Sequence, residues 1–196
     1  AANTFINNVT ISYLQKNLAP EITAVIIHNP GEYYSPESSG SSGDKKSGGL
    51  VFPQPLSKSE FKKGFRSVDW LFEDPNFDAL VFDVYYKTNG HTIWRELAKD
   101  LAASVYSWDS SLMEDGEYYI QVVAKDTPAN PENLALSHKK TSDLFVIDNT
   151  GPTIKTEQNQ NTLLVSVVDD WSIIKSFEYS INAQEYKEIY PVDGIN

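Results

Sequence analysis

Oxygen-bearing side chains alternate along one short stretch of the chain, Asp74-Pro75-Asn76-Phe77-Asp78. Alternate carboxylate and amide oxygens on a tight loop are ligands that Ca²⁺ takes in proteins. The stretch lacks the downstream glycine and the bidentate glutamate of an EF-hand loop. The structural alternative is that Asp74 and Asn76 cap a turn by accepting hydrogen bonds from backbone N–H groups. The sequence favours the turn and leaves Ca²⁺ as the single candidate cofactor.

Catalytic motifs are absent from the sequence. The three histidines, His28, His91 and His138, are scattered among strand and loop positions, and the chain has no cysteine. No G-x-S-x-G, H-E-x-x-H or glycine-rich phosphate loop occurs. We therefore predict that the protein is not an enzyme and assign it no catalytic residue.

The elements that position these residues are strands, and the clearest pair spans residues 68–86. Apolar and polar residues alternate there with the period of two that places one set on one face of a sheet. The apolar set, which includes the heaviest aromatic load of the chain, is Val68, Trp70, Phe72, Leu80, Phe82, Val84 and Tyr86. We expect this face, and Trp70 in particular, to form the core of a sandwich.

Further strands are expected on both sides of this pair. The expected ranges are 22–28, 92–97, 104–111, 117–125 and 144–148, with a helical turn near 59–63 and a loop with a broken strand or a helical turn at 127–140. Asn89-Gly90 is a strong hairpin signal. About seven strands with turn signals every 8–12 residues are typical of an immunoglobulin-like β-sandwich. In that architecture Asp126 and Asn130 lie at the same end as the 74–78 loop, so the candidate metal ligands are Asp74, Asn76, Asp78 and Asp126.

Exposed aromatic residues offer a second kind of site. Flat rings can stack on sugars or anchor a protein partner. The candidates are Trp94, Trp108, Tyr33, Tyr34, Tyr85 and Tyr119. The structural alternative places Tyr106 and Trp108 in the core and pairs Tyr85 with Tyr119 on an outer face. A carbohydrate-binding module would present a coplanar exposed row of Trp and Tyr.

Composition excludes several classes of partner. The chain has 27 acidic and 16 basic residues among 196, a net charge of -11. This balance argues against nucleic acid, whose phosphates attract a basic surface. No stretch approaches the roughly 18 apolar residues of a membrane span, and no signal peptide is recognisable. We expect neither nucleic-acid binding nor membrane insertion.

The chain divides into three parts. Residues 1–17 read as a strand from the end of a preceding module, 18–150 as the sandwich, and 151–196 as the truncated start of a second sandwich with strands at 163–167, 177–181 and 186–190. Gly and Ser dominate 31–50, which we expect to be a flexible insertion. Because the chain starts in a strand-like segment and stops after a turn, we expect a piece of a longer polypeptide.

Several motifs occur in the order found in a known family. Trp70, the DVYYK strand at 83–87, and Leu112 followed by the Asp115-Gly116 turn and Tyr118 resemble a fibronectin type III domain. More closely, residues 18–150 resemble domains at the C-terminal end of large secreted bacterial β-propeller proteins, and 151–196 resembles the next module in them. Gly151 stands where such linkers usually have proline. The resemblance implies an extracytoplasmic location, and the function of such domains is mostly unassigned.

The prediction for function is a non-catalytic structural or interaction module of a larger secreted or periplasmic bacterial protein, monomeric as a module. Its partners would be the flanking domains of the same polypeptide and a protein or carbohydrate ligand. Two alternatives stay open: a carbohydrate-binding module with exposed Trp and Tyr, and an accessory domain of an extracellular hydrolase. The sign of the second would be a pocket with convergent carboxylates.

Overall fold

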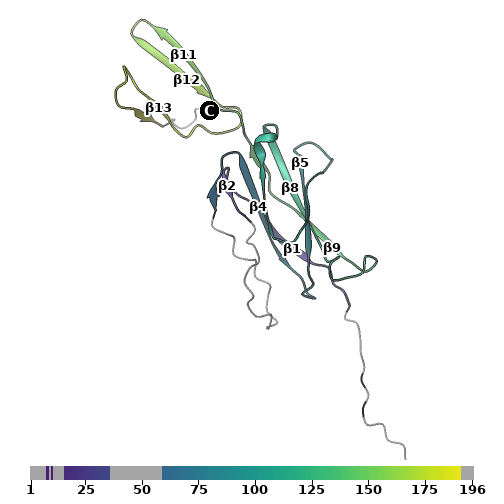
Figure 1. Ribbon diagram of the computed structural model, residues 1–196. Helices are drawn as coiled ribbons and strands as arrows, with labels where there is room; N and C mark the ends of the chain where they lie inside the picture. Colours follow the sequence, from purple (N-terminus) through teal and green to yellow (C-terminus); the bar gives the residue numbers. More distant parts are fainter. Residues whose placement is uncertain (1–7, 9, 11–15, 36–58, 191–196) are drawn as a thin grey trace, which may run out of the picture.

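The computed structural model describes residues 8, 10, 16–35 and 59–190, and the structural statements below concern those residues (Figure 1). Apart from one 3-10 turn, the elements are strands. In chain order they are β1 (Glu21–Ile27), β2 (Glu32–Tyr33), β3 (Glu60–Phe61), β4 (Phe65–Glu73), β5 (Val81–Thr88), β6 (Arg95–Leu101), β7 (Val105–Asp109), η1 (Ser110–Leu112), β8 (Gly116–Lys125), β9 (Ser137–Thr141), β10 (Phe145–Ile147), β11 (Thr153–Asn159), β12 (Thr162–Val168), β13 (Phe177–Tyr179) and β14 (Lys187–Ile189).

Two antiparallel sheets form the main body. One has the strand order β1-β4-β7, and the other has the order β10-β8-β5-β6, with β9 also paired to β8. β9 and β10 pair with successive parts of β8, so β8 and β5 are the central strands of the larger sheet. The predicted all-β class is confirmed.

The core lies between these two sheets and follows the predicted alternation. Along β8, buried and partly buried residues alternate strictly, because one face of the strand points to the other sheet. The rings of Trp70 on β4 and Phe82 on β5 are 5.2 Å apart between centroids, which joins the two sheets. The buried cluster consists of Ile22, Val68, Trp70, Phe82, Val84, Trp108, Ile120, Val122 and Ala124. The prediction that Trp70 is a core residue is confirmed.

The outer face of β4 is also covered, because residues 28–35 pass over it. Ser67 Oγ donates to the carbonyl of Glu32 at 2.6 Å, and His28 Nε2 lies 2.8 Å from Asp69 Oδ1. Gly31 allows this path, since its φ is 84° and a Cβ there would lie 2.4 Å from Phe61 Cε2. Part of the expected flexible insertion is therefore strand β2, paired with β3. The rest of that insertion, 36–50, lies outside the described residues, as does most of the expected N-terminal strand.

Several expected boundaries are wrong. β6 begins at Arg95 rather than at residue 92, because 89–94 form the loop after β5. The expected helical turn near 59–63 is β3, whereas the broken strand that the sequence allowed within 127–140 is present as the start of β9. Tyr85 lies opposite Gln121 and Tyr119 opposite Lys87, so the two tyrosines are not a directly opposed pair.

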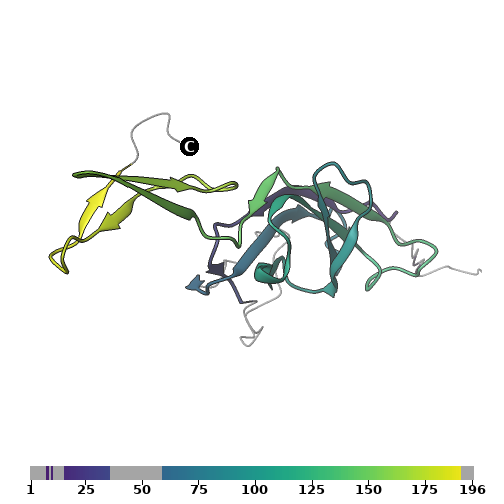
Figure 2. The same cartoon turned by 90° about the horizontal axis from the view of Figure 1, so that it is seen from above.

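Beyond β10 the chain forms two separate ribbons, β11–β12 and β13–β14, which extend away from the sandwich (Figures 1 and 2). β11 was not predicted, and β13 and β14 are shorter than expected. None of residues 151–190 is buried. Two-stranded ribbons are marginally stable by themselves, because they leave apolar side chains in water. Ile154, Leu163 and Tyr186 are among the exposed apolar residues here.

Candidate functional site

The four predicted metal ligands, Asp74, Asn76, Asp78 and Asp126, lie at one end of the sandwich and are called the acidic pole below. The β4–β5 loop carries the first three, and Asp126 follows β8. Asn130 Nδ2 donates to Asp78 Oδ2 at 2.8 Å, so the two loops meet as the sequence predicts.

Asp74 performs the structural role that the sequence favours. Its Oδ1 accepts from the backbone N–H groups of Asn76 and Asp78, both at 2.9 Å. These two hydrogen bonds fix the turn before β5. Its Oδ2 is buried and has no hydrogen-bond partner among the described residues, which is an unfavourable arrangement for a carboxylate oxygen.

Asp126 and Asn76 hold the segment that leads into β1. Asp126 is fully buried, and its two oxygens accept from Leu136 N and from Asn17 Nδ2, each at 2.6 Å. Asn76 Oδ1 accepts from Leu18 N at 2.7 Å, and its Nδ2 donates to the carbonyl of Lys16. In the described part of the chain, no group of three His, Cys, Asp or Glu side chains is suited to hold a metal ion. The Ca²⁺ site stays a prediction.

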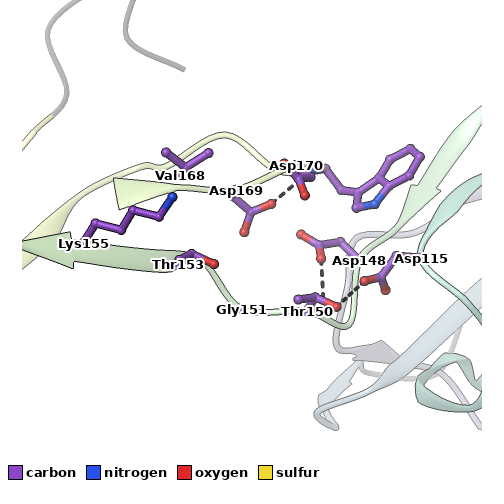
Figure 3. A pocket seen from close by; sticks show the side chains of 10 residues that line it. Asp115, Asp148, Thr150, Gly151, Thr153, Lys155, Val168, Asp169 and Asp170 are labelled. Atoms are coloured by element: carbon purple, nitrogen blue, oxygen red, sulfur yellow. Dashed lines mark hydrogen bonds between the residues drawn. The ribbon is translucent and has the colours of Figure 1, made fainter. Parts of the chain in front are cut away.

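A second acidic site, not predicted from the sequence, lies where β10 leads into β11. This junction cavity has a volume of about 310 Å³. Figure 3 shows carboxylates from three separate segments around it. Its lining consists of Asp115, Asp148, Thr150, Gly151, Thr153, Lys155, Val168, Asp169, Asp170 and Trp171.

Hydrogen bonds at the junction cavity fix the linker peptide. Asn149 N donates to Asp115 Oδ1 at 2.6 Å, and the Thr150 hydroxyl donates to Asp115 Oδ2 (Figure 3). Asn149 Nδ2 reaches two backbone carbonyls, Ser110 O at 3.0 Å and Met113 O at 2.9 Å. The Asn149 side chain therefore attaches the start of the β10–β11 linker to the connection between β7 and β8.

Carboxylates also connect the turn after β12 to the β10–β11 linker at the junction cavity. Asp169 Oδ1 accepts from the backbone of Trp171 and Ser172 at 3.0 and 2.8 Å, which forms a turn after β12. The Ser172 hydroxyl donates to Asp148 Oδ2. Burial raises the pKa of Asp148, and the charges of Asp169 and Asp115 raise it further, although the N–H of Thr150 opposes them. The pKa of Asp169 is lowered by the N–H groups of Ser172 and Trp171.

Most of the candidate aromatic side chains are buried or in contact with neighbouring side chains. Trp108 is buried, and its Nε1 lies 3.3 Å from Met113 Sδ. Lys87 Nζ lies 5.1 Å from the ring centroid of Trp94 and 5.3 Å from that of Tyr119. Tyr34 packs against His28 with ring centroids 4.4 Å apart. Trp171, which the sequence did not single out, is 45% exposed beside the junction cavity.

No protein-family model, curated protein or solved structure matches this chain. The described residues contain no helix with the length and apolar character needed to cross a membrane. The site is therefore interpreted from its own geometry.

Proposed function

We propose that this chain is a non-catalytic structural and interaction module of a larger secreted or periplasmic bacterial protein, and that its sandwich has the immunoglobulin-like, fibronectin type III-like topology. The pairing orders β1-β4-β7 and β6-β5-β8, with β9 and β10 beyond β8, support the topology. So does Tyr118, whose hydroxyl donates to the carbonyl of Glu114 at 2.8 Å. A tyrosine near the start of the sixth strand makes such a bond in this architecture.

The proposal depends mainly on how the chain enters and leaves the sandwich. Residues 16–18 are held at the acidic pole by Asp126 and Asn76, and Asn149 and Thr150 are held at the opposite end by Asp115. Asp115 precedes β8 and Asp126 follows it, so the two attachments are separated by a ten-residue strand. At about 3.3 Å per residue that is a spacing of about 33 Å. Fixed attachments at opposite ends suit a spacer that sets the orientation of its neighbours.

The experiment compares the orientational order of residues 151–190 in the intact chain and in Asn149→Ala. Residual dipolar couplings report the order of β11–β12 relative to the sandwich. We expect the couplings of residues 153–168 to shrink by at least about a third in Asn149→Ala, since three hydrogen bonds at the linker are lost or loosened. Asn159→Ala, in the loop end of β11, is the matched control and should leave them unchanged. Equal couplings in all three proteins would contradict the proposal.

Two alternatives remain proposals of their own. A carbohydrate-binding module needs a row of exposed flat rings, but Trp70 and Trp108 are buried and Trp94 is covered on one face by Lys87, which leaves Trp171 as the one exposed tryptophan among the described residues. The four aspartates at the junction cavity correspond to the convergent carboxylates expected of a hydrolase accessory domain. Oxygens of Asp115, Asp148 and Asp169 accept hydrogen bonds from the linker and from the turn after β12, which favours a structural role for these three.

A further inference from the structure

A second cavity, with a volume of about 410 Å³, opens at the end of the sandwich opposite the acidic pole. Thr88 pairs with Tyr118 at this end of the larger sheet, whereas Val81 pairs with Lys125 at the other. The cavity is called the mouth cavity here. Its lining consists of Tyr86, Lys87, Thr88, His91, Ile93, Arg95, Leu112, Met113, Glu114 and Tyr118. Its volume falls in the range of ligand-binding pockets.

Two aliphatic side chains at the mouth cavity are left in water. Ile93 is 74% exposed and Leu112 is 86% exposed, and they come from the β5–β6 loop and from η1. A single exposed aliphatic residue is ordinary, but two beside one cavity form a contact surface. Met113 lines the same cavity, and its sulfur contacts the Trp108 indole, so the floor is anchored to the core.

The charge of this cavity is opposite to that of the protein. The chain carries -11, yet Lys87, His91 and Arg95 gather here beside a single carboxylate, Glu114. Among the described residues, none of these three basic groups has a carboxylate within ion-pair distance, whereas Lys99 and Lys125 do. The rings of Trp94 and Tyr119 hold Lys87 Nζ in place. Lys87 and Arg95, without a carboxylate partner among the described residues and next to exposed aliphatic groups, complement a ligand that is both anionic and apolar.

We infer that the mouth cavity binds an acidic peptide segment of a partner protein, with an apolar side chain placed between Ile93 and Leu112 and carboxylates against Arg95 and Lys87. Aliphatic side chains favour a peptide over a sugar, whose rings stack on flat aromatic faces. Tyr118 is almost fully buried and its hydroxyl already bonds to Glu114 O, so it is not free for stacking. This inference deepens the proposed interaction role and rests on it.

The test uses the whole 196-residue chain, labelled with ¹⁵N, and the acetylated, amidated pentapeptide Glu-Leu-Asp-Phe-Glu. We expect concentration-dependent shifts of amide signals in 86–95 and 112–118, weakening as salt rises, because the contact includes ion pairs. The Gln-Leu-Asn-Phe-Gln peptide should bind at least about threefold more weakly. A carboxylated sugar, a galacturonate trimer, is the third probe and should not shift these signals.

Variants assign the binding to the mouth cavity. Arg95→Gln should weaken binding about twofold to fivefold, as expected for one exposed ion pair. Leu112→Ser should weaken it as well, since an apolar contact is removed. Lys139→Gln, an exposed lysine on β9, is the control and should bind like the wild type. The ¹⁵N spectra show directly that each variant is folded.

Several outcomes would overturn the inference. They are equal binding of the neutral peptide, equal weakening by Lys139→Gln, shifts caused by the sugar but not by the peptide, and no shifts with either probe. The linker experiment is independent of them, because Asn149 does not line the mouth cavity. Loss of linker order in Asn149→Ala together with absent peptide binding would leave the structural module standing and remove only this ligand.

Discussion

Asp115 and Asp126 stand at the two ends of β8, and each accepts a 2.6 Å hydrogen bond from an asparagine far away in the sequence. Asp115 takes the backbone N–H of Asn149, and Asp126 takes the side-chain amide of Asn17. The same central strand therefore anchors both connections of the sandwich. These bonds make the attachments sensitive to single substitutions.

Removing the Asp126 carboxylate should destabilise the sandwich. Asp126→Ala removes the acceptor of the part-buried Leu136 N–H and leaves the Asn17 amide with Leu134 O as its remaining acceptor, and an unsatisfied buried group costs about 1–3 kcal/mol. We expect a loss of about 1–3 kcal/mol in the free energy of unfolding by urea. Glu132→Ala, an exposed acidic residue in the same loop, is the control and should change stability by less than about 0.5 kcal/mol. Equal effects would contradict the role of Asp126.

Truncation of Trp70 should be among the most damaging changes in the core. Trp70→Ala is expected to cost about 3–5 kcal/mol, as for other large aromatic truncations. Trp70→Phe should cost less, since the indole Nε1 has no hydrogen-bond partner among the described residues and its loss breaks no bond there. Urea midpoints of both variants give the comparison. An unchanged midpoint for Trp70→Ala would contradict the packing described for β4.

Calcium should leave the stability of the acidic pole unchanged. Asp74 Oδ1, both oxygens of Asp126 and Asn76 Oδ1 already accept hydrogen bonds. A ligand of the folded state at a hundredfold excess over its Kd would add about 2.7 kcal/mol, so melting curves are sensitive enough. We expect curves in millimolar Ca²⁺ and in chelator to overlay. A melting temperature that rises with Ca²⁺ would contradict this expectation. If the rise were smaller with Mg²⁺ and absent in Asp78→Ala, the unpartnered Asp74 Oδ2 would be assigned to a metal site.

The pH dependence should reveal the ion pair of Asp83. Burial alone would raise the pKa of Asp83, but the N–H of Asp100 and the ammonium of Lys125 outweigh it and lower that pKa below 3.8. A lowered folded-state pKa contributes stability above the ordinary value, and this stability is lost as the pH falls through the folded-state pKa. The free energy of unfolding of the wild type should therefore fall more steeply below about pH 4 than that of Asp83→Asn.

Asp69 provides a control with the opposite sign. Burial raises its pKa, and the nearby His28 only partly offsets this. A raised folded-state pKa favours the protonated, folded form, so this group adds stability as the pH falls into the window just above 3.8. Asp69→Asn should make the free energy of unfolding fall more steeply as the pH is lowered, whereas Asp83→Asn should make it fall less steeply. Changes in slope relative to the wild type that have the same sign in the two variants would contradict these assignments.

Residues 36–49 should be dispensable for folding. This prediction concerns residues outside the described part of the chain and rests on their Gly- and Ser-rich composition. Replacement by a short Gly/Ser link should change stability by less than about 1 kcal/mol, since loop-closure entropy varies slowly with length. The link must begin after Ser35, because residues 28–35 cover Ser67 and Asp69. A large drop in melting temperature would show that the replaced residues dock onto the sandwich.

Strict alternation made the central strands predictable from the sequence. In β8 every second residue is apolar and buried, so local pattern and tertiary position agree. β11 was missed and β9 was expected only as one alternative, a broken strand, because Thr153–Asn159 and Ser137–Thr141 are mostly polar, and pairing partners rather than side-chain pattern define them. β2 was missed because its two residues precede a Gly- and Ser-rich run.

The two acidic sites also differ in how far the sequence could predict them. Asp74 and Asn76 are close in sequence, so their turn could be predicted, and Asp126 followed from an assumed architecture. Asp115, Asp148 and Asp169 come from three distant segments, and nothing in their spacing indicates that they meet. Asn149-Thr150, directly after the predicted strand 144–148, is the one local signal that points to a specific linker.

The attachments at opposite ends of β8 also determine how the sandwich would bear tension. β1 begins at the acidic pole, where Glu21 pairs with Glu73, and β10 finishes beside Gly116 at the other end. Tension applied between residues 18 and 150 would therefore act along these terminal strands, perpendicular to their hydrogen bonds to β4 and β8. The bonds would be loaded together in shear rather than opened one after another, so the sandwich would behave as a stiff link in an extended chain. Single-molecule pulling at residues 18 and 150 would measure this as one high-force rupture.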